Sequence, residues 1–344
     1  MPDTDHLTDR QLRVLEAVVQ TYVETAEPTG SQTIARRFGL GVSPATIRSI
    51  MSELEDKGYL FHPHTSAGRV PTDRAYRAYV DRVMRGSPPN QQERTALAEL
   101  QASRAAVDDV LHRAAQVLGV LTQELGVAVG PALETVVLDR LELVRVSAER
   151  LLLVFNLRSG VVRTIFVQVP GSVAPDAVQR IAQVLNDRLA GHTLQDIRAT
   201  LPERLRDADG SAAGRELLNI FIAEGDGIFD LADESAAVVL SSAQMLAEQP
   251  EFASSPRMRN LLQLTERRDL LRQALESRRR SGLSITIGGE NSDPRLTDLT
   301  LVTSSYRIGD LSGVIGVIGP TRMPYDKIIG LVEHTSQLVE GLLE

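Results

Sequence analysis

The 344-residue sequence contains no cysteine. That absence excludes disulfides, thiol catalysis and zinc held by cysteine, and it suits a reducing compartment. No stretch of about 18 apolar residues occurs, so the sequence predicts no membrane-spanning helix. The N-terminus, MPDTDHLTDR, is acidic and lacks the apolar segment of a signal peptide. We therefore expect a soluble, cytoplasmic protein.

The signatures of common catalytic sites are missing as well. There is no H-E-x-x-H metal motif and no G-x-S-x-G nucleophile motif. The segment GVIGVIG (313–319) spaces its glycines by three, unlike a dinucleotide or phosphate loop, and predicts a closely packed buried strand. His62 and His64 form an H-x-H pair, but no third ligand lies nearby, and phosphate contacts or packing explain the pair better. We therefore expect no enzyme, no catalytic residue, no cofactor and no metal.

Charge is unevenly distributed along this acidic chain, whose net charge is −8. Residues 36–85 contain nine Lys or Arg against five Asp or Glu, an excess of four positive charges, so the remainder carries −12. A basic stretch inside an acidic protein is compatible with nucleic-acid binding at that stretch. The length, together with a hydrophobic content of 42%, predicts two or three folded domains.

The first 85 residues carry the signals of short, capped helices. Thr8 and Gln11 form a capping box ahead of an amphipathic stretch, and a second helix begins near Ser31 and ends at Gly39. Ser43 is a typical N-cap, and it is followed by proline at the first helical position. Apolar residues then recur at helical spacing: Ile47, Ile50, Met51 and Leu54. The two short helices and their glycine-bearing turn predict a helix-turn-helix.

The third helix has a second face that is small and polar. A face that only meets water usually carries Glu and Lys pairs. Here the face holds small or hydroxyl-bearing residues with one arginine at its flank: Ala45, Thr46, Arg48, Ser49 and Ser52. Such a surface near a helix N-terminus is typical of a recognition helix that meets base edges. A purely structural three-helix bundle is the alternative interpretation.

The segment GYLFHPHTSAGRVPT (58–72) predicts a β-hairpin directly after this helix. A strand-like run over 59–62 turns back to a second run at 69–70, and a hairpin in this place makes a winged helix. Hydroxyls and backbone N–H groups suit phosphates, and an arginine suits the minor groove. The residues that we expect to hold the wing on DNA are His64, Thr65, Ser66 and Arg69.

The remaining chain alternates between helical and strand patterns. After the linker GSPPNQ, apolar residues, mostly leucine, recur in steps of three and four from Leu97 to Leu125 with one polar interruption at Arg104. This pattern fits either a coiled coil between subunits or a long helix on a sheet. We favour the sheet, because strand patterns follow. Runs at 135–146, 151–157 and 161–169 predict an antiparallel meander, 175–280 is helical, strands then return, and a last helix starts near Tyr325. This order predicts one sheet domain that is interrupted by an insertion.

Five blocks of sequence, spread over nearly the whole chain, are distinctive as a set. They are EPTGSQTIA, SPATIRSIMSELEDKGYLFHPHTSAGRVPTDRAYRAYVD, EFASSPRMRNLLQLTE, SITIGGEN and GVIGVIGPTRMPYDKII. Together they resemble the heat-inducible transcription repressor HrcA family. Two positions depart from the family pattern: Ser49 replaces an asparagine on the expected reading face, and Ala75 replaces a glycine.

The resemblance implies an α+β protein with an N-terminal winged helix-turn-helix and a GAF-like α/β sheet domain that is interrupted by a mainly helical dimerisation domain. The boundaries that we expect are 1–85 for the winged helix, 92–170 and 283–344 for the two parts of the GAF-like domain, and 171–282 for the insertion.

The resemblance also implies a function and partners. It implies a homodimeric repressor of heat-shock genes that binds an inverted-repeat operator on double-stranded DNA and is kept active by the GroEL chaperonin. One alternative is a winged-helix regulator controlled by a small ligand in the GAF-like domain, near GPTRMPYDK (319–327), where Arg322 would pair with an acid. Another is a protein-binding adaptor, which the small polar face argues against. The expected DNA contacts are Ser43, Ala45, Thr46, Arg48, Ser49, Ser52, His64, Thr65, Ser66 and Arg69.

Overall fold

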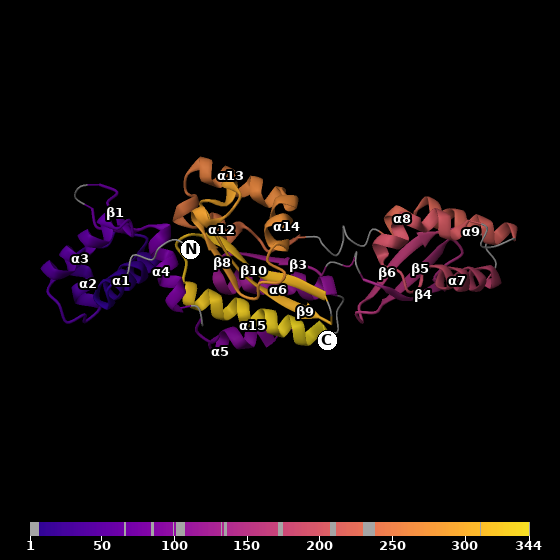
Figure 1. Ribbon diagram of the computed structural model, residues 1–344, viewed down its shortest axis with the longest axis horizontal. Helices are drawn as coiled ribbons and strands as arrows, with labels where there is room; N and C mark the ends of the chain where they lie inside the picture. Colours follow the sequence, from indigo (N-terminus) through magenta and orange to yellow (C-terminus); the bar gives the residue numbers. More distant parts are fainter. Residues whose placement is uncertain are drawn as a thin grey trace.

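Three bodies lie in a row along the long axis of the molecule (Figure 1). An N-terminal helical domain stands at one end, a domain built on a five-stranded sheet lies in the middle, and a smaller α/β domain forms the other end. The computed structural model describes residues 7–64, 67–83, 86–98, 100, 107–131, 133, 136–170, 175–206, 211–229, 238–309 and 311–343. Among these residues, no helix is long and apolar enough to cross a membrane.

The N-terminal domain is a winged helix-turn-helix. Its elements are α1 (Asp9–Thr25), α2 (Ser31–Arg37), α3 (Pro44–Asp56), β1 (Leu60–Phe61), β2 (Val70–Pro71) and α4 (Asp73–Val83). The predicted capping box is present, since Gln11 N donates to Thr8 Oγ1 at 3.3 Å and Thr8 N donates to Gln11 Oε1 at 3.0 Å. Ile47 and Leu54 of α3 are completely buried against α1 and α2. The α+β class with its N-terminal winged helix is confirmed.

The middle domain is a five-stranded antiparallel sheet with helices on both faces. Its strands are β3 (Leu125–Val129), β7 (Val238–Leu240), β8 (Ser284–Ile287), β9 (Leu299–Ile308) and β10 (Leu311–Pro320), in the spatial order β7-β3-β10-β9-β8. One face is covered by α6 (Val107–Thr122) and α15 (Tyr325–Leu343), with α5 (Gln91–Ala98) packed beside them. The other face is covered by α12 (Gln244–Ala247), α13 (Ser255–Glu266) and α14 (Arg268–Glu276). The short 3-10 turns η2 (Pro250–Phe252), η3 (Gly288–Glu290) and η4 (Pro294–Leu296) connect these elements. The predicted leucine seam therefore lies, through α6, on a sheet.

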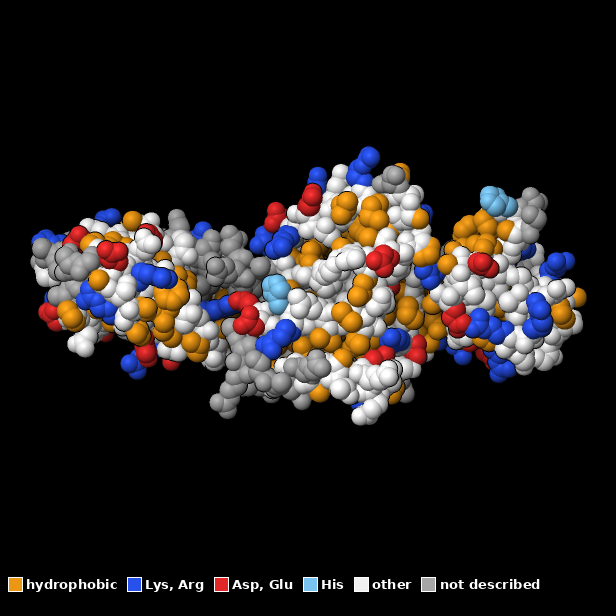
Figure 2. All heavy atoms as spheres, turned by 180° about the vertical axis from the view of Figure 1, so that it is seen from behind, with side chains coloured by type: hydrophobic (Ala, Val, Ile, Leu, Met, Phe, Trp, Pro, Cys, Tyr) orange, Lys and Arg blue, Asp and Glu red, His pale blue; other side chains and the backbone are white. Residues whose placement is uncertain are grey.

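The third body is a separate three-stranded antiparallel sheet with helices on one face. It consists of β4 (Leu138–Arg145), β5 (Arg150–Leu157), β6 (Val162–Gln168), α7 (Pro175–Leu189), α8 (Leu194–Leu205), α9 (Ala212–Ala223) and α10 (Gly225–Phe229). Leu151, Leu153 and Phe155 are buried on the covered face. No helix of the described chain covers the opposite face, and Figure 2 shows hydrophobic side chains gathered over these strands from behind.

The expected grouping of strands needs correction. The meander assigned to the GAF-like segment 92–170 pairs only within itself and belongs to the insertion, while β7, α12, α13 and α14, which the sequence grouped into 171–282, belong to the middle domain. The insertion therefore leaves the sheet after β3 and returns at β7, and besides its helices it contains a three-stranded sheet of its own. Periodicity identifies a strand but not its neighbour, and Leu125, the first residue of β3, continues the leucine spacing of α6.

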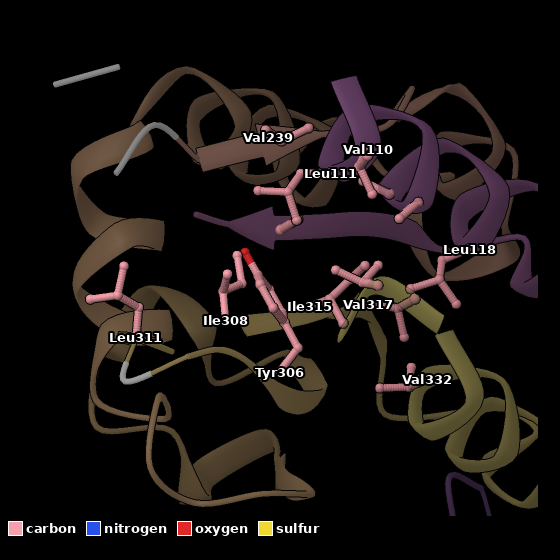
Figure 3. Packing of buried hydrophobic residues seen from close by; sticks show 14 of the residues in the cluster. Val110, Leu111, Leu118, Val239, Tyr306, Ile308, Leu311, Ile315, Val317 and Val332 are labelled. Carbon is pink, nitrogen blue, oxygen red and sulfur yellow. The ribbon is translucent and has the colours of Figure 1, made fainter. Parts of the chain in front are cut away.

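The core of the middle domain forms between α6, α15 and the sheet (Figure 3). Leu111 and Leu118 of α6 point toward the strands, where they meet side chains such as Ile315 of β10. The buried hydroxyl of Tyr306 donates to the carbonyl of Val129 at 3.1 Å. A Cβ at Gly313 would lie 2.2 Å from the Tyr306 ring, so glycine is required there. The prediction of a closely packed buried strand over 313–319 is confirmed.

Candidate DNA-binding surface

The recognition helix starts at a well-formed cap. Thr46 N donates to Ser43 Oγ at 3.2 Å, and the two hydroxyl oxygens of these residues lie 3.0 Å apart. Pro44 occupies the first turn, where a missing N–H costs nothing. The first turn of α3 is thereby fixed, and Ser43 and Thr46 use their hydroxyls for the cap while lying at the exposed end of the helix.

The two faces of α3 divide as the sequence predicts. The apolar residues Ile47, Ile50, Met51 and Leu54 are buried. The side chains of the opposite face are exposed, and they are Ala45, Arg48, Ser49 and Ser52. Small side chains let a helix backbone approach base edges closely, and serine hydroxyls can donate or accept a hydrogen bond there. The surface has the shape and polarity that a groove-reading helix needs.

Arg48 stands out among the basic residues of this region. Several of the arginines that gave residues 36–85 their positive charge are paired with acids: Arg37 with Glu24, Arg69 with Glu55, Arg77 with Glu290 and Arg82 with Glu16. Arg48 is exposed and forms no ion pair with the described residues. Arg36 on α2 is also exposed, and its Nε donates to the carbonyl of Gln32 at 3.4 Å. Sequence reasoning counted Arg36 as charge without giving it a role, because its exposure depends on how α2 packs on α3.

The wing is present and short. Leu60 pairs with Pro71 and Phe61 with Val70, both antiparallel. Beyond the strands, His64 is exposed, and its carbonyl accepts from Ala67 N at 2.9 Å. Thr65 and Ser66, which the sequence placed at the tip, lie outside the described residues. The structure thus places His64 at the exposed end of the hairpin, where a backbone phosphate could be met.

Arg69 does not lie where the sequence prediction put it. Its Nη2 is 2.8 Å from Glu55 Oε2, and only 14% of its side chain is exposed. His62 Nδ1 lies 2.8 Å from the other oxygen of Glu55. The backbone N–H and C=O of Arg69 both bond to Thr29, each at 2.9 Å. Arg69 therefore ties the base of the wing to α3 and to the α1–α2 loop, through a partner, Glu55, that sequence spacing did not connect to it.

A helix-turn-helix with an exposed recognition helix and a β-wing, joined to a large α/β domain, defines a DNA-binding transcription regulator. The chain matches the family described as HrcA protein C terminal domain over residues 108–329, and the LexA DNA binding domain over residues 4–68. The chain belongs to the HrcA family of heat-inducible transcription repressors, as the resemblance in its sequence indicated.

Curated relatives agree along their whole length. A heat-inducible transcription repressor HrcA of Chlorobium phaeobacteroides (strain BS1) is 38% identical, with 95% of this chain and 96% of the relative covered. The repressor of the same name from Chlorobium limicola is 36% identical, with 99% of both chains covered. A solved structure described as a hypothetical protein shares the fold, with a TM-score of 0.72 and 23% identity over 98% of this chain and 99% of that one. The family consists of transcription repressors and not of enzymes.

Proposed function

We propose that this protein is a dimeric repressor that reads an inverted-repeat operator upstream of chaperone genes. The observation that carries the proposal is the exposed, small and polar face of α3 beside the wing. In this proposal the α3 residues enter the major groove, Arg48 contacts guanine or phosphate, and the wing touches the backbone. The proposed contacts are Ser43, Ala45, Thr46, Arg48, Ser49, Ser52, His64, Thr65 and Ser66, with Arg69 holding the wing in place.

The uncovered face of the inserted sheet supports the dimer. A cross-strand row joins Val144, Leu152 and Phe166 on that face. Val144 is 45% exposed and Phe166 is 55% exposed, as is Val162, which lies two rows away on the same face of the sheet. A contiguous apolar patch of this kind on a soluble protein marks an interface. A second copy that places the same face against it forms an isologous contact, the commonest symmetry of homodimers, and a two-fold protein matches a two-fold operator.

The role proposed for the chaperonin is supported by family membership rather than by a feature of the described surface. In this part of the proposal, GroEL keeps the repressor in its DNA-binding form. When heat diverts the chaperonin to unfolded clients, active repressor falls and transcription rises. The family name records the heat response of the relatives, and the chaperonin supplies the physical link between temperature and DNA binding.

Fluorescence anisotropy tests the operator proposal. The purified protein is titrated at one salt concentration against the inverted repeat from upstream of the organism's own chaperonin operon, and against a scrambled duplex of equal composition. We expect a preference of about 10³-fold or more for the inverted repeat. Equal, weak binding to both duplexes, unchanged when GroEL and ATP are added, refutes the operator proposal. A preference that rises only on adding GroEL supports the chaperonin step.

A cavity supports a second candidate function, regulation by a small ligand. It has a volume of about 210 Å³ and lies beside η2 and α13, where Arg257 and Asn260 face the apolar Phe252 and Leu261 and the backbone turn at Thr321. Small-molecule sites combine an apolar lining with a few polar groups that orient the ligand, and both kinds of side chain line this cavity. A ligand that raises the melting temperature and weakens operator binding would favour this candidate over chaperonin control.

A further inference from the structure

The last helix of the winged-helix domain is seated on an edge strand of the middle domain. Arg77 of α4 donates from Nη2 to the carbonyl of Ile285 at 2.8 Å, and Ile285 belongs to β8, the edge of the five-stranded sheet. Arg77 Nε donates to Glu290 Oε1 at 2.7 Å. The hydrogen bond to Glu290 raises the pKa of Arg77. Asp73, also on α4, accepts from Gly289 N at 3.0 Å.

A second arginine joins the same two domains from the opposite direction. Arg322 follows β10 in the middle domain, and its Nη1 donates to the carbonyl of Val23 in α1 at 2.7 Å. That carbonyl lies in the last turn of α1, where no helical N–H remains to satisfy it. Arg322 Nη2 also donates to Glu251 Oε2 at 3.0 Å, and the side chains of Arg322 and Glu251 are only 15% and 20% exposed. The acid that the sequence anticipated for Arg322 is Glu251.

The two attachments restrict rotation as well as distance. Arg77 holds α4 to the β8 edge, whereas Arg322 holds the end of α1 to the turn after β10, so the contacts act on different helices and different strands. The rings of Tyr76 on α4 and Tyr325 on α15 add a contact between the two domains, with centroids 5.9 Å apart. A single contact would act as a pivot, but two contacts on separate elements fix the angle of the domain. Figure 1 shows α4 at this junction, between the winged helix and the sheet.

We infer that Arg77 and Arg322 are positioning residues that set the orientation of the winged helix on the middle domain, and so set the spacing between operator half-sites that the dimer accepts. The inference rests on the proposed dimer and inverted repeat. In a two-fold dimer, the distance between the two recognition helices follows from how each winged helix sits on its own core. Neither arginine touches DNA in this scheme; both act through the placement of α3.

The test measures a spacing profile. Operators with the natural spacer, and with spacers one to four base pairs longer or shorter, are titrated with the wild-type protein and with an Arg77→Ala, Arg322→Ala double variant. We expect the wild type to favour one spacing by about tenfold or more, and the variant to discriminate by less than about threefold, because a loosely tethered second domain tolerates more geometries. Binding to an isolated half-site is expected to be the same for both proteins.

Two further variants make the result decisive. Arg180→Ala removes an exposed arginine that pairs with Asp176 on α7, and it should leave the profile as in the wild type. Glu251→Gln with Glu290→Gln removes the charges paired with the two arginines with almost no change in side-chain size and leaves the backbone acceptors Ile285 and Val23 in place, so it should give a profile between those of the wild type and the alanine variant. A double variant with the wild-type profile and an intact melting transition overturns the inference. A wild type that ignores spacing, or prefers a single half-site, refutes paired reading itself and removes the role with it.

Discussion

Glu124 is a buried carboxyl group that forms no ion pair with the described residues. It precedes β3, it is 2% exposed, and Gln249 Nε2 donates to its Oε2 at 3.1 Å. Burial raises the pKa of Glu124 to about 8, with the hydrogen bond from Gln249 and the charge of Arg322 opposing the rise. A buried carboxyl in this state is protonated in the folded protein at neutral pH and ionised in the unfolded chain.

Glu124 therefore makes stability depend on pH in a defined direction. Between the ordinary pKa of 4.5 and about 8, the folded state binds a proton that the unfolded state has lost, so the free energy of unfolding falls as pH rises. Glu124→Gln mimics the protonated form and removes this loss. We expect the variant to gain stability over the wild type from pH 5 to pH 8, by up to a few kcal/mol, since each pKa unit is about 1.4 kcal/mol. Urea unfolding at both pH values measures it, and a difference that does not change with pH would contradict the burial of the charge.

Alanine variants of Arg48 and Arg69 should differ in how they change the salt dependence of operator binding. Arg48→Ala removes an exposed cation from the reading face, so we expect weaker operator binding and a salt-dependence slope that is smaller by about one. Arg69→Ala removes the partner of Glu55 at the wing base, so it should lower the melting temperature and leave the slope close to wild type. Anisotropy titrations at four salt concentrations compare them. Equal losses of slope in the two variants would mean that Arg69 reaches the phosphates after all.

The residue types of the site were readable from sequence, but their partners were not. Ser43 and Pro44 predict the start of a helix, because both act within its first turn. The helical period then predicts that Ala45, Ser49 and Ser52 are exposed, since they lie opposite the apolar residues. Arg69 was assigned to DNA because an arginine at the tip of a wing suits the minor groove. Its burial depends on Glu55, which shares no periodic pattern with it, and only the packing of the wing on α3 brings them together.

At the scale of secondary-structure elements, the sequence predicted features that depend on neighbouring residues but not the pairing of strands that are distant in the chain. The helix starts at Thr8 and Ser43 were predicted, because a cap is satisfied within three residues. Strands of the meander were also predicted, since each hairpin is local. The membership of β3 and β7 in the middle sheet was missed, because their partners lie far along the chain and hydrogen bonding between distant strands leaves no local pattern.

The wing is an element whose position depends on one glycine. A Cβ at Gly68 would lie 2.4 Å from the carbonyl carbon of Thr29, a backbone atom that cannot rotate away. Gly68→Ala should therefore push the wing from the α1–α2 loop and break the two Arg69–Thr29 hydrogen bonds. We expect a lower melting temperature and weaker operator binding. Gly39→Ala is the control for stability, because no atom lies within 4 Å of its added carbon; equal melting temperatures for the two variants would show that the loop yields freely.

At the scale of the whole molecule, each of the three domains has a separate role in the proposed function. The winged helix carries the reading face, the middle domain holds it through Arg77 and Arg322, and the inserted domain presents the uncovered sheet. The insertion is attached to the middle domain by Arg163 of β6, whose Nη2 donates to Asp108 Oδ1 of α6 at 3.1 Å. Through these contacts, the proposed subunit interface on the inserted domain determines the position of the recognition helix α3 relative to its copy in the second subunit.

The uncovered sheet gives the prediction that connects assembly with DNA binding. Phe166→Asp places a charge on the apolar face, at the β6 end of the row Val144–Leu152–Phe166, where the ring now lies 4.5 Å from the guanidinium of Arg150, and burying that charge against a second copy would be costly. We expect sedimentation to show monomer at micromolar concentration, an inverted-repeat affinity reduced to that of a single half-site, and unchanged half-site binding. Thr164→Asp, one row away on the same strand, is the matched control for added charge at the edge of the patch and should have a smaller effect. A Phe166→Asp protein that remains dimeric and binds the full operator as the wild type does would place the subunit contact elsewhere, because an interface through this face would have to remove the aspartate from water.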